Sequence, residues 1–273
     1  MPQLQSILAP ALAVVLGWFA SSCATKPTGL PTRLADHDAR MEKGYIVYLD
    51  GAGGGTAKKN WAGGVQDGLL AAGYQGAGDM YSWETGEGLK ADQVASVEYK
   101  RARALGAAWR IEKYVADYPG RPIQVLGFSA GTAIGIFALE HLEPETKVDN
   151  IVLLGASISH DYDLTGALKH VRDKLYIFTT THDHMVGFFM KFTGTADRKR
   201  HNEGADIHGF VLPPNANEET RKLYAEKIVT IPWKESMKKS GDRGHHFDNV
   251  KMEFIRDYVA PLLMGKTEAA LPE

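Results

Sequence analysis

The sequence contains one cysteine, Cys23, among its 273 residues. A single thiol excludes an intramolecular disulfide and the zinc sites that are built from pairs of cysteines, and we expect no metal centre. Concentrated positive charge is lacking too, since the formal net charge is −2 and the longest basic run is Arg198-Lys199-Arg200. Proteins that bind nucleic acid carry clustered Lys and Arg, so we expect no nucleic-acid partner.

Long hydrophobic runs are also absent. The apolar stretch from Ile7 to Ala20 is shorter than the roughly 20 residues that a membrane-spanning helix needs, and it ends in small residues as a secretory signal peptide does. The segment Ala20-Ser21-Ser22-Cys23 resembles a bacterial lipobox, although residues 1–5 contain no Lys or Arg. This resemblance implies cleavage before Cys23, acylation of its thiol and anchoring to a membrane of the bacterial cell envelope. An ordinary signal peptide, with a secreted or periplasmic product, is the alternative.

The remaining chain predicts one globular domain. Hydrophobic residues make up 44% of the chain and charged residues 23%, as in soluble globular proteins, and this length suffices for one sizeable core. We therefore expect a signal peptide at 1–22, a tether at 23–43, the folded domain at 44–265 and a short C-terminal tail at 266–273.

Strand-like and helix-like segments alternate from residue 44 onward. We expect helices at about 59–72, 94–118, 131–142 and 250–262, between β-prone runs at 45–49, 78–83, 123–128, 150–155, 175–180 and 228–233. This alternation predicts an α/β fold, with a mostly parallel central sheet and helices on both faces. Residues 187–226 depart from the pattern, and we expect there either a lid insertion or, in part, another helix packed on the core.

A GxSxG motif, Gly127-Phe128-Ser129-Ala130-Gly131, stands between a predicted strand and a predicted helix. A tight turn at this point needs very small flanking residues, and it pushes the serine out over the carboxyl edge of the sheet with a helix N-terminus beneath it. The motif in this context predicts that Ser129 is a nucleophile.

From these features the chain resembles the α/β-hydrolase family over roughly residues 44–263. The resemblance implies a serine hydrolase that cleaves a small-molecule carboxylic ester or thioester through an acyl-enzyme, without a cofactor. It also implies a catalytic acid after a later strand and a histidine after the last strand. Asp183, just past the predicted strand at 175–180, is the expected acid, and Asp161 and Asp163 are the alternatives.

The expected base lies in the segment Arg243-Gly244-His245-His246-Phe247. In related hydrolases this loop often reads Gly-Gly-His, which aligns His246 with the catalytic position and leaves His245 as the alternative. A serine hydroxyl needs such a base because it is a poor nucleophile alone. For the oxyanion hole, the resemblance implies the backbone N–H groups of Ala130 and Ala52, although Asp50 stands where many members have histidine.

The glycine cluster that begins at Gly51 also raises the question of a phosphate-binding loop. A dinucleotide-binding GxGxxG from this glycine would need glycine where Thr56 stands, and a Walker A loop would need glycine rather than Ala57 before Lys58. We therefore expect no nucleotide cofactor.

Two further alternatives belong to other classes of protein. The segment Thr181-His182-Asp183-His184 begins like the metal motif of the metallo-β-lactamase fold, but Val186 and Gly187 occupy the positions of its Asp and His. The other alternative is a lipid-anchored binding or scaffold protein on a hydrolase fold that has lost activity. A fold-level resemblance does not name a substrate, so acyl-chain length stays open.

Overall fold

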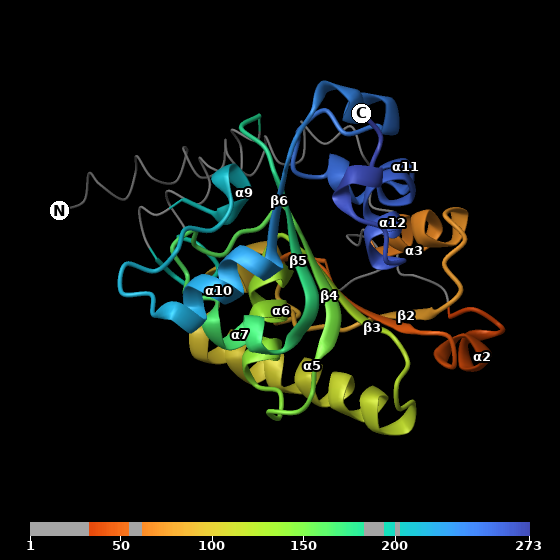
Figure 1. Cartoon of the computed structure of the whole chain (residues 1–273), viewed down its shortest axis with the longest axis horizontal. Coiled ribbons are helices and arrows are strands. Elements are labelled where there is room, and N and C mark those ends of the chain that lie inside the picture. The colour runs from red at the N-terminus through yellow and green to blue at the C-terminus, as the bar shows by residue number, and fades with distance from the viewer. Residues whose placement is uncertain (1–32, 55–61, 183–193, 200–202) are drawn as a thin grey trace.

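The computed structural model describes residues 33–54, 62–182, 194–199 and 203–273 (Figure 1). Six strands form one sheet in the order β2-β1-β3-β4-β5-β6, and every neighbouring pair is parallel. The strands are β1 (Tyr45–Leu49), β2 (Ala77–Met80), β3 (Ile123–Phe128), β4 (Val148–Leu154), β5 (Val171–Thr179) and β6 (Ile228–Pro232). The structure thus confirms the predicted α/β fold class with a parallel central sheet.

Every residue of β1, β3 and β4 is buried, because helices cover both faces of the sheet. Alternate residues of a strand point to opposite faces, so Val47 and Ile46 belong to two separate hydrophobic clusters. This double burial explains why the strands read as continuous apolar runs.

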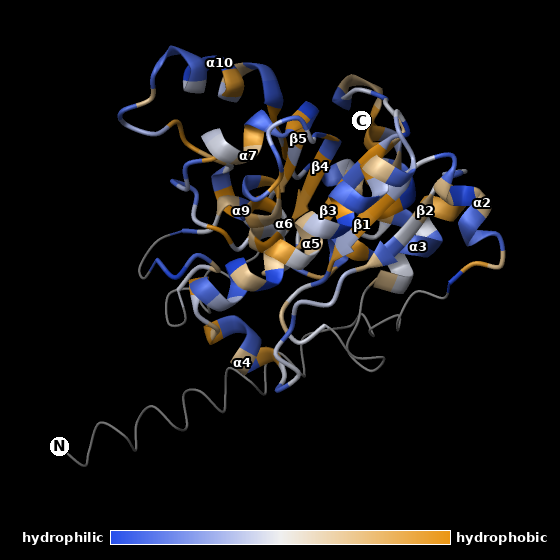
Figure 2. Ribbon diagram, turned by 90° about the horizontal axis from the view of Figure 1, so that it is seen from below, coloured by the Kyte–Doolittle hydropathy of each residue, from blue (hydrophilic) through white to orange (hydrophobic). Residues whose placement is uncertain are grey.

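The helices divide between the two faces (Figures 1 and 2). One apolar cluster contains residues of α5 (Val97–Asp117), α6 (Gly131–Glu140), α7 (Thr165–Lys169) and α10 (Glu218–Lys227). The other contains residues of α3 (Ala62–Ala71) and of the closing helix, which comprises α11 (Met252–Phe254), a π-helical segment (Ile255–Val259) and α12 (Ala260–Leu263). No described helix has the length and apolar content to cross a membrane.

Short elements complete the fold. They are α2 (His37–Met41), α4 (Leu89–Val94), α9 (Ala205–His208) and three 3₁₀ turns at Glu235–Ser240, Asp248–Val250 and Glu268–Ala270. The predicted helix at 94–118 corresponds to α5, which begins only at Val97, and Val94 is the last residue of the separate element α4. Between them the backbone of Ser96 is extended, and its side chain accepts a hydrogen bond from the Tyr99 N–H, so Ser96 begins a new helix.

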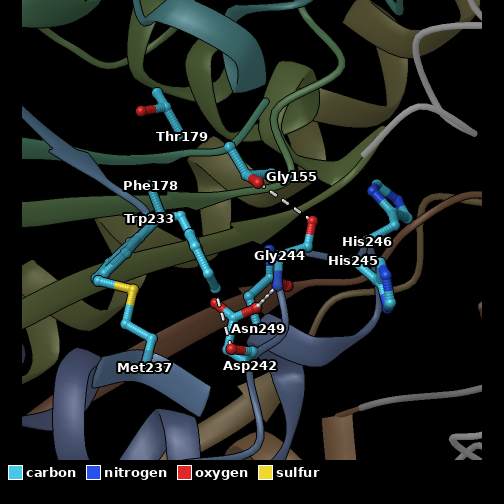
Figure 3. Close-up of a pocket in the computed structure, with 11 residues that line it drawn as sticks. Gly155, Phe178, Thr179, Trp233, Met237, Asp242, Gly244, His245, His246 and Asn249 are labelled. Atoms are coloured by element: carbon cyan, nitrogen blue, oxygen red, sulfur yellow. Dashed lines mark hydrogen bonds between the residues drawn. The ribbon is translucent and has the colours of Figure 1, made fainter. Parts of the chain in front are cut away.

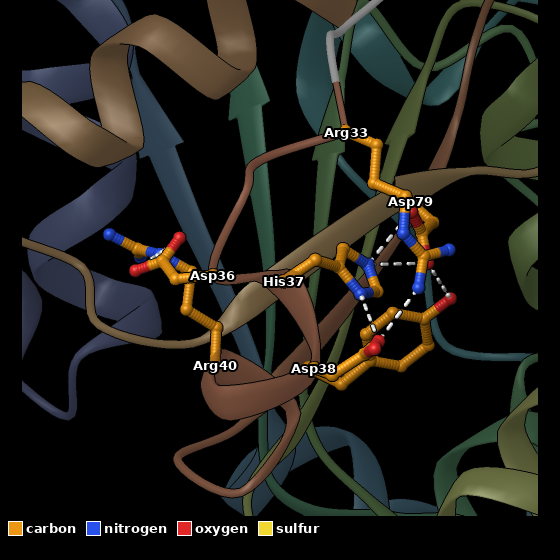
Figure 4. A network of polar contacts seen from close by, with 7 residues as sticks. Arg33, Asp36, His37, Asp38, Arg40 and Asp79 are labelled. Carbon is orange, nitrogen blue, oxygen red and sulfur yellow. Dashed lines mark hydrogen bonds and ion pairs between the residues drawn. The ribbon is translucent and has the colours of Figure 1, made fainter.

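A polar network fixes α2 to the edge strand β2 (Figure 4). The Nε2 atom of the buried His37 lies 3.1 Å from both carboxylate oxygens of Asp79, and the Tyr45 hydroxyl donates to the same carboxylate at 3.1 Å. Residues 37–41, within the stretch expected as a tether, therefore pack against the sheet.

The described part of 187–226 packs on the core. Ala196 and Ala205 are fully buried, and the Ala196 N–H donates to the Ser157 carbonyl at 2.7 Å. The helix α10 contributes the buried Tyr224 to the core cluster. This helix therefore matches the alternative that part of residues 187–226 forms another helix packed on the core. Residues 187–193 and 200–202 lie outside the described part of the chain.

Candidate active site

Ser129 occupies the sharp turn between β3 and α6. Its φ angle is +52°, in the left-handed region that residues other than glycine seldom adopt. The Ser129 N–H donates to the Leu154 carbonyl at 2.9 Å, and the Thr132 hydroxyl donates to the Ser129 carbonyl at 2.6 Å. These bonds hold a strained backbone at the carboxyl edge of the sheet, where such strain often marks a functional residue.

The two glycines of the motif are required by close backbone approaches. A Cβ on Gly127 would lie 2.9 Å from Thr132 Cα, and a Cβ on Gly131 would lie 2.2 Å from the Leu49 carbonyl oxygen. Both contacts are with main-chain atoms, which cannot move aside as the flexible end of a side chain can. The motif thus keeps β1, β3 and α6 close enough to form the turn.

His246 lies above the ends of β3 and β4. Its side chain is buried, with the residue only 5% exposed, and its ring centroid is 4.9 Å from that of Phe128, the residue before Ser129. On the other side, a Cβ on Gly155 would come within 2.9 Å of the His246 Nδ1 and Cε1 atoms. The imidazole therefore packs between Phe128 at the end of β3 and Gly155, the residue after β4.

The adjacent His245 has a different environment. Its side chain is 68% exposed, and its Nδ1 atom lies 3.4 Å from an Asp248 carboxylate oxygen. The two imidazole rings extend in opposite directions from the loop (Figure 3). The structure thus separates the two candidate bases into one buried ring beside the serine turn and one ring at the surface.

The loop after β1 lies against Ser129, since a Cβ on Gly51 would be 3.0 Å from Ser129 Cβ. Most N–H groups of this loop are already bonded: that of Gly51 to the Asp50 carboxylate at 2.8 Å, that of Gly53 to the Asp92 carboxylate at 2.7 Å, and that of Gly54 to the Gly51 carbonyl at 3.0 Å.

The N–H groups of Ala52 and Ala130 differ from those of the loop glycines in their hydrogen bonding. Neither meets an acceptor in the part of the chain that the structure describes, and both residues are at most 9% exposed. Buried backbone N–H groups are usually bonded. Within the described residues, the two expected oxyanion donors thus lack a protein acceptor, unlike their neighbours in the loop.

Asp183, the expected acid, lies outside the described residues, which resume at residue 194. The strand that leads to it, β5, pairs with β4 along Ile151–Leu153, and so ends at the same edge of the sheet as Ser129 and His246. The two alternatives are exposed and have other contacts. Asp161 pairs with Lys199 at 2.8 Å, and Asp163 accepts hydrogen bonds from the N–H and the hydroxyl of Thr165 at the start of α7.

Among the buried carboxyl groups near the site, Asp206 and Asp242 lie close to the ends of β4, β5 and β6 and were not expected from the sequence. Asp206 is 1% exposed, and its backbone bridges the ends of two strands: its N–H donates to the Ala156 carbonyl at 3.2 Å, and its carbonyl accepts from the Thr180 N–H at 2.7 Å. It follows no strand and belongs to the irregular 187–226 stretch, so no pattern in the sequence indicates it.

Asp242 is the second of these groups, four residues before His246. It is 6% exposed, its Oδ1 accepts the Gly244 N–H at 2.7 Å, and its carbonyl accepts from the Trp233 indole at 3.2 Å. Burial raises the pKa of Asp242 to about 7, against the lowering effect of the Gly244 hydrogen bond. The sequence does show an acidic residue in the loop that carries His246. Its burial, however, depends on the tertiary structure and could not be predicted.

A small cavity adjoins His246 on the side of β5 and β6 (Figure 3). Phe178, Trp233 and Met237 provide apolar walls, and Asp242 and Asn249 line it with polar groups. Ser129 is not among the lining residues. Within the described segments, no three His, Cys, Asp or Glu side chains are grouped as a metal site would require.

No protein-family model and no curated protein matches this chain. Among solved structures it is similar to carboxyl esterase 2 of Tuber melanosporum, with 10% identity, a TM-score of 0.45 and coverage of 84% of this chain and 79% of that one. A lipase-esterase related protein of Clostridium acetobutylicum gives 10% identity, a TM-score of 0.44 and coverage of 88% and 98%.

A puromycin-hydrolyzing peptidase of Mycobacterium tuberculosis gives 12% identity and a TM-score of 0.42 over 82% of this chain. The present chain spans only 35% of that peptidase. These are distant likenesses of architecture, and the function proposed below rests on the geometry of the site itself.

Proposed function

We propose that this protein is a serine hydrolase that cleaves a carboxylic ester or thioester, with Ser129 as nucleophile, His246 as base and Asp183 as the acid. One observation carries the proposal: Ser129 has a φ of +52° at the end of β3, and a buried imidazole packs on Phe128, the residue before it. A strained, partly exposed serine at such a turn, with a buried histidine packed on the residue before it, supports activation of the hydroxyl by that imidazole.

In the proposed reaction, the Ser129 hydroxyl attacks the substrate carbonyl while His246 takes its proton. The oxyanion that forms accepts hydrogen bonds from the N–H groups of Ala52 and Ala130. His246 then returns the proton to the departing alcohol or thiol, which leaves an acyl group on Ser129. A water molecule, deprotonated by the same imidazole, releases the carboxylic acid and restores the serine. Asp183 orients the imidazole and stabilises its charged form.

A fluorophosphonate probe tests whether the serine is activated. Wild-type protein should be labelled stoichiometrically at Ser129, located by peptide mass spectrometry, and heat-denatured protein should remain unlabelled. A panel of p-nitrophenyl esters of rising acyl length, with matched thioesters, then defines the substrate class. Intact folded protein that is neither labelled nor active on any member would favour the non-catalytic binding or scaffold protein instead.

We also propose that Cys23 carries the lipid anchor that holds the enzyme to a bacterial envelope membrane. Support comes from the sequence alone, namely the apolar run before Ala20-Ser21-Ser22-Cys23. The described fold is compatible with such a tether, since its first described residue, Arg33, lies at the domain surface and pairs with the exposed Asp38.

A further inference from the structure

We propose that Asp92 is a positioning residue of the active site, which holds the loop after β1 so that the Ala52 N–H can bind the oxyanion. This inference rests on the proposed hydrolase function. Asp92 belongs to the short helix α4, which carries none of the site residues predicted from the sequence. It is nevertheless fully buried.

The contacts of Asp92 are short and directional. Its Oδ2 accepts the Gly53 N–H at 2.7 Å. Its Oδ1 accepts both the N–H and the hydroxyl of Thr85, at 2.7 and 2.6 Å. Three donors thus converge on one carboxylate, and hydrogen bonds to an ionised acceptor are about twice as strong as neutral ones.

Gly53 directly follows Ala52, so the bond to Asp92 fixes the peptide next to the proposed donor. The φ of Gly53 is +75°, and a Cβ on this residue would lie 2.8 Å from Leu89 Cβ. The loop therefore adopts a backbone conformation that glycine permits and approaches α4 closely. The Asp92 carboxylate compensates for the N–H groups that this approach removes from water.

A buried cation lies near Asp92. Lys100, fully buried on α5, donates from Nζ to the carbonyls of Gln93 and Ala196, each at 3.1 Å. Burial lowers the pKa of Lys100 to about 8, and the nearby charge of Arg198 lowers it as well, whereas the carboxylates of Asp197 and Asp92 raise it. The carboxylate that holds this loop thus lies in the interior of the protein, near a buried lysine, and is not exposed to solvent.

Removing the Asp92 carboxylate should weaken binding of the transition state and leave binding of the substrate unchanged. An oxyanion donor acts on charge that develops during the reaction, so its displacement lowers kcat and leaves ground-state binding largely unchanged. A shift of the order of 1 Å can reduce the rate about 100-fold. A merely structural role would lower the melting temperature without this selectivity.

The test compares Asp92→Asn and Asp92→Ala with Thr85→Val as the matched control. An amide has one acceptor oxygen, so Asp92→Asn leaves either Gly53 or Thr85 facing an NH₂ group. Thr85→Val removes the hydroxyl donor to the same carboxylate and retains the Gly53 bond. For each folded variant we would measure kcat, KM, the Ki of an alkylboronic acid as a tetrahedral analogue, and the Ki of the corresponding carboxylic acid.

We expect Asp92→Asn and Asp92→Ala to reduce kcat about 10- to 100-fold, with KM within about threefold of wild type. Boronic acid binding should weaken in parallel, carboxylic acid binding should not, and Thr85→Val should stay within about threefold of wild type in kcat. If Asp92→Ala does not fold, Asp92→Asn decides alone. A folded Asp92→Asn with wild-type kcat, or with boronic and carboxylic acid binding weakened equally, would overturn the proposal.

Hydrogen–deuterium exchange separates this inference from the proposed function. The backbone amides of residues 51–54 should exchange faster in Asp92→Asn than in wild type or Thr85→Val, whether or not the protein hydrolyses esters. Unchanged exchange would overturn the anchoring role. A wild-type protein that is inactive on all esters but shows the expected exchange would refute the hydrolase function and leave the anchoring of the loop intact.

Discussion

The imidazole of His246 lies directly against Gly155, so that a Cβ at this glycine would approach its Nδ1 and Cε1 atoms to 2.9 Å. Gly155 follows Leu154, whose carbonyl accepts the Ser129 N–H. The end of β4 thus positions both residues: the Leu154 carbonyl binds the Ser129 N–H, and the missing side chain of Gly155 leaves room for the His246 ring. We therefore expect substitutions of Ser129 and of His246 to have similar kinetic effects.

Ser129→Ala should abolish hydrolysis of every accepted ester and leave the fold intact. The loss in kcat should be on the order of 10⁴ to 10⁶, as for other triad serines. Steady-state kinetics on a chromogenic ester measures it, and thermal unfolding checks that the melting temperature is retained. Purified, folded Ser129→Ala with more than about a tenth of wild-type activity would rule Ser129 out as nucleophile.

The two neighbouring histidines should differ sharply on substitution. His246→Ala should cost nearly as much as Ser129→Ala, because a triad acts as a unit. His245→Ala should change kcat/KM by about tenfold or less, equivalent to about 1.4 kcal/mol, since its side chain is 68% exposed. The reverse pattern in steady-state kinetics would assign the role to His245, and small losses in both would place the base elsewhere.

Gly131→Ala should destabilise the protein and reduce its activity, because the added methyl would meet the Leu49 and Asp50 carbonyl oxygens at 2.2 and 2.5 Å. We expect a loss of about 2–4 kcal/mol in the free energy of unfolding.

The matched control is Gly135→Ala in the same helix. A Cβ there would meet only side-chain methyl groups, at 3.3 to 3.4 Å, and alanine favours the helix by up to about 1 kcal/mol over glycine. Urea denaturation of both variants provides the measurement, and equal effects at the two positions would contradict the explanation.

Asp242→Asn should alter how stability depends on pH. Folded protein keeps Asp242 protonated up to its pKa of about 7, whereas an unfolded aspartic acid ionises near pH 3.9. Between these values the folded state binds more protons, so this group makes stability fall as pH rises, and above about pH 7 the loss is complete. The neutral amide removes that loss.

The free energy of unfolding of Asp242→Asn, relative to wild type, should therefore improve from about pH 5 to about pH 8. Urea denaturation at several pH values measures the difference, with Asp173→Asn on the exposed surface of β5 as control. Parallel pH profiles for wild type and Asp242→Asn would show that Asp242 is ionised in the folded protein throughout this range.

Cys23→Ser should move the protein from the membrane fraction to a soluble one, or block its processing. Cys23 is the only cysteine, so the change removes every thiol that could be acylated. Fractionation and intact mass measurement of protein expressed in a bacterium provide the test. Unchanged membrane association of both forms, with an uncleaved N-terminus, would refute the anchor.

The sequence by itself determined the sheet, the helices on its two faces and the turn at Ser129. Strand–helix alternation is a local signal, and GxSxG can be interpreted because it stands between a predicted strand and a predicted helix. The contacts that require Gly127 are local too, whereas those that require Gly131 come from the carbonyl oxygens of Leu49 and Asp50, far away in the sequence. Element ends were less certain, as at Ser96, whose capping side chain starts α5 at Val97, three residues after the start that the apolar periodicity predicted.

Only the tertiary structure decided which groups are buried, which are exposed and which hydrogen bonds are already made. His245 and His246 are neighbours with the same chemistry, and the packing of one against Phe128 and Gly155 distinguishes them. Asp92 lies 39 residues from Gly53, and the raised pKa of Asp242 arises from burial. Such properties depend on atoms contributed by distant parts of the chain, because desolvation and hydrogen-bond partners are set by packing rather than by sequence neighbours.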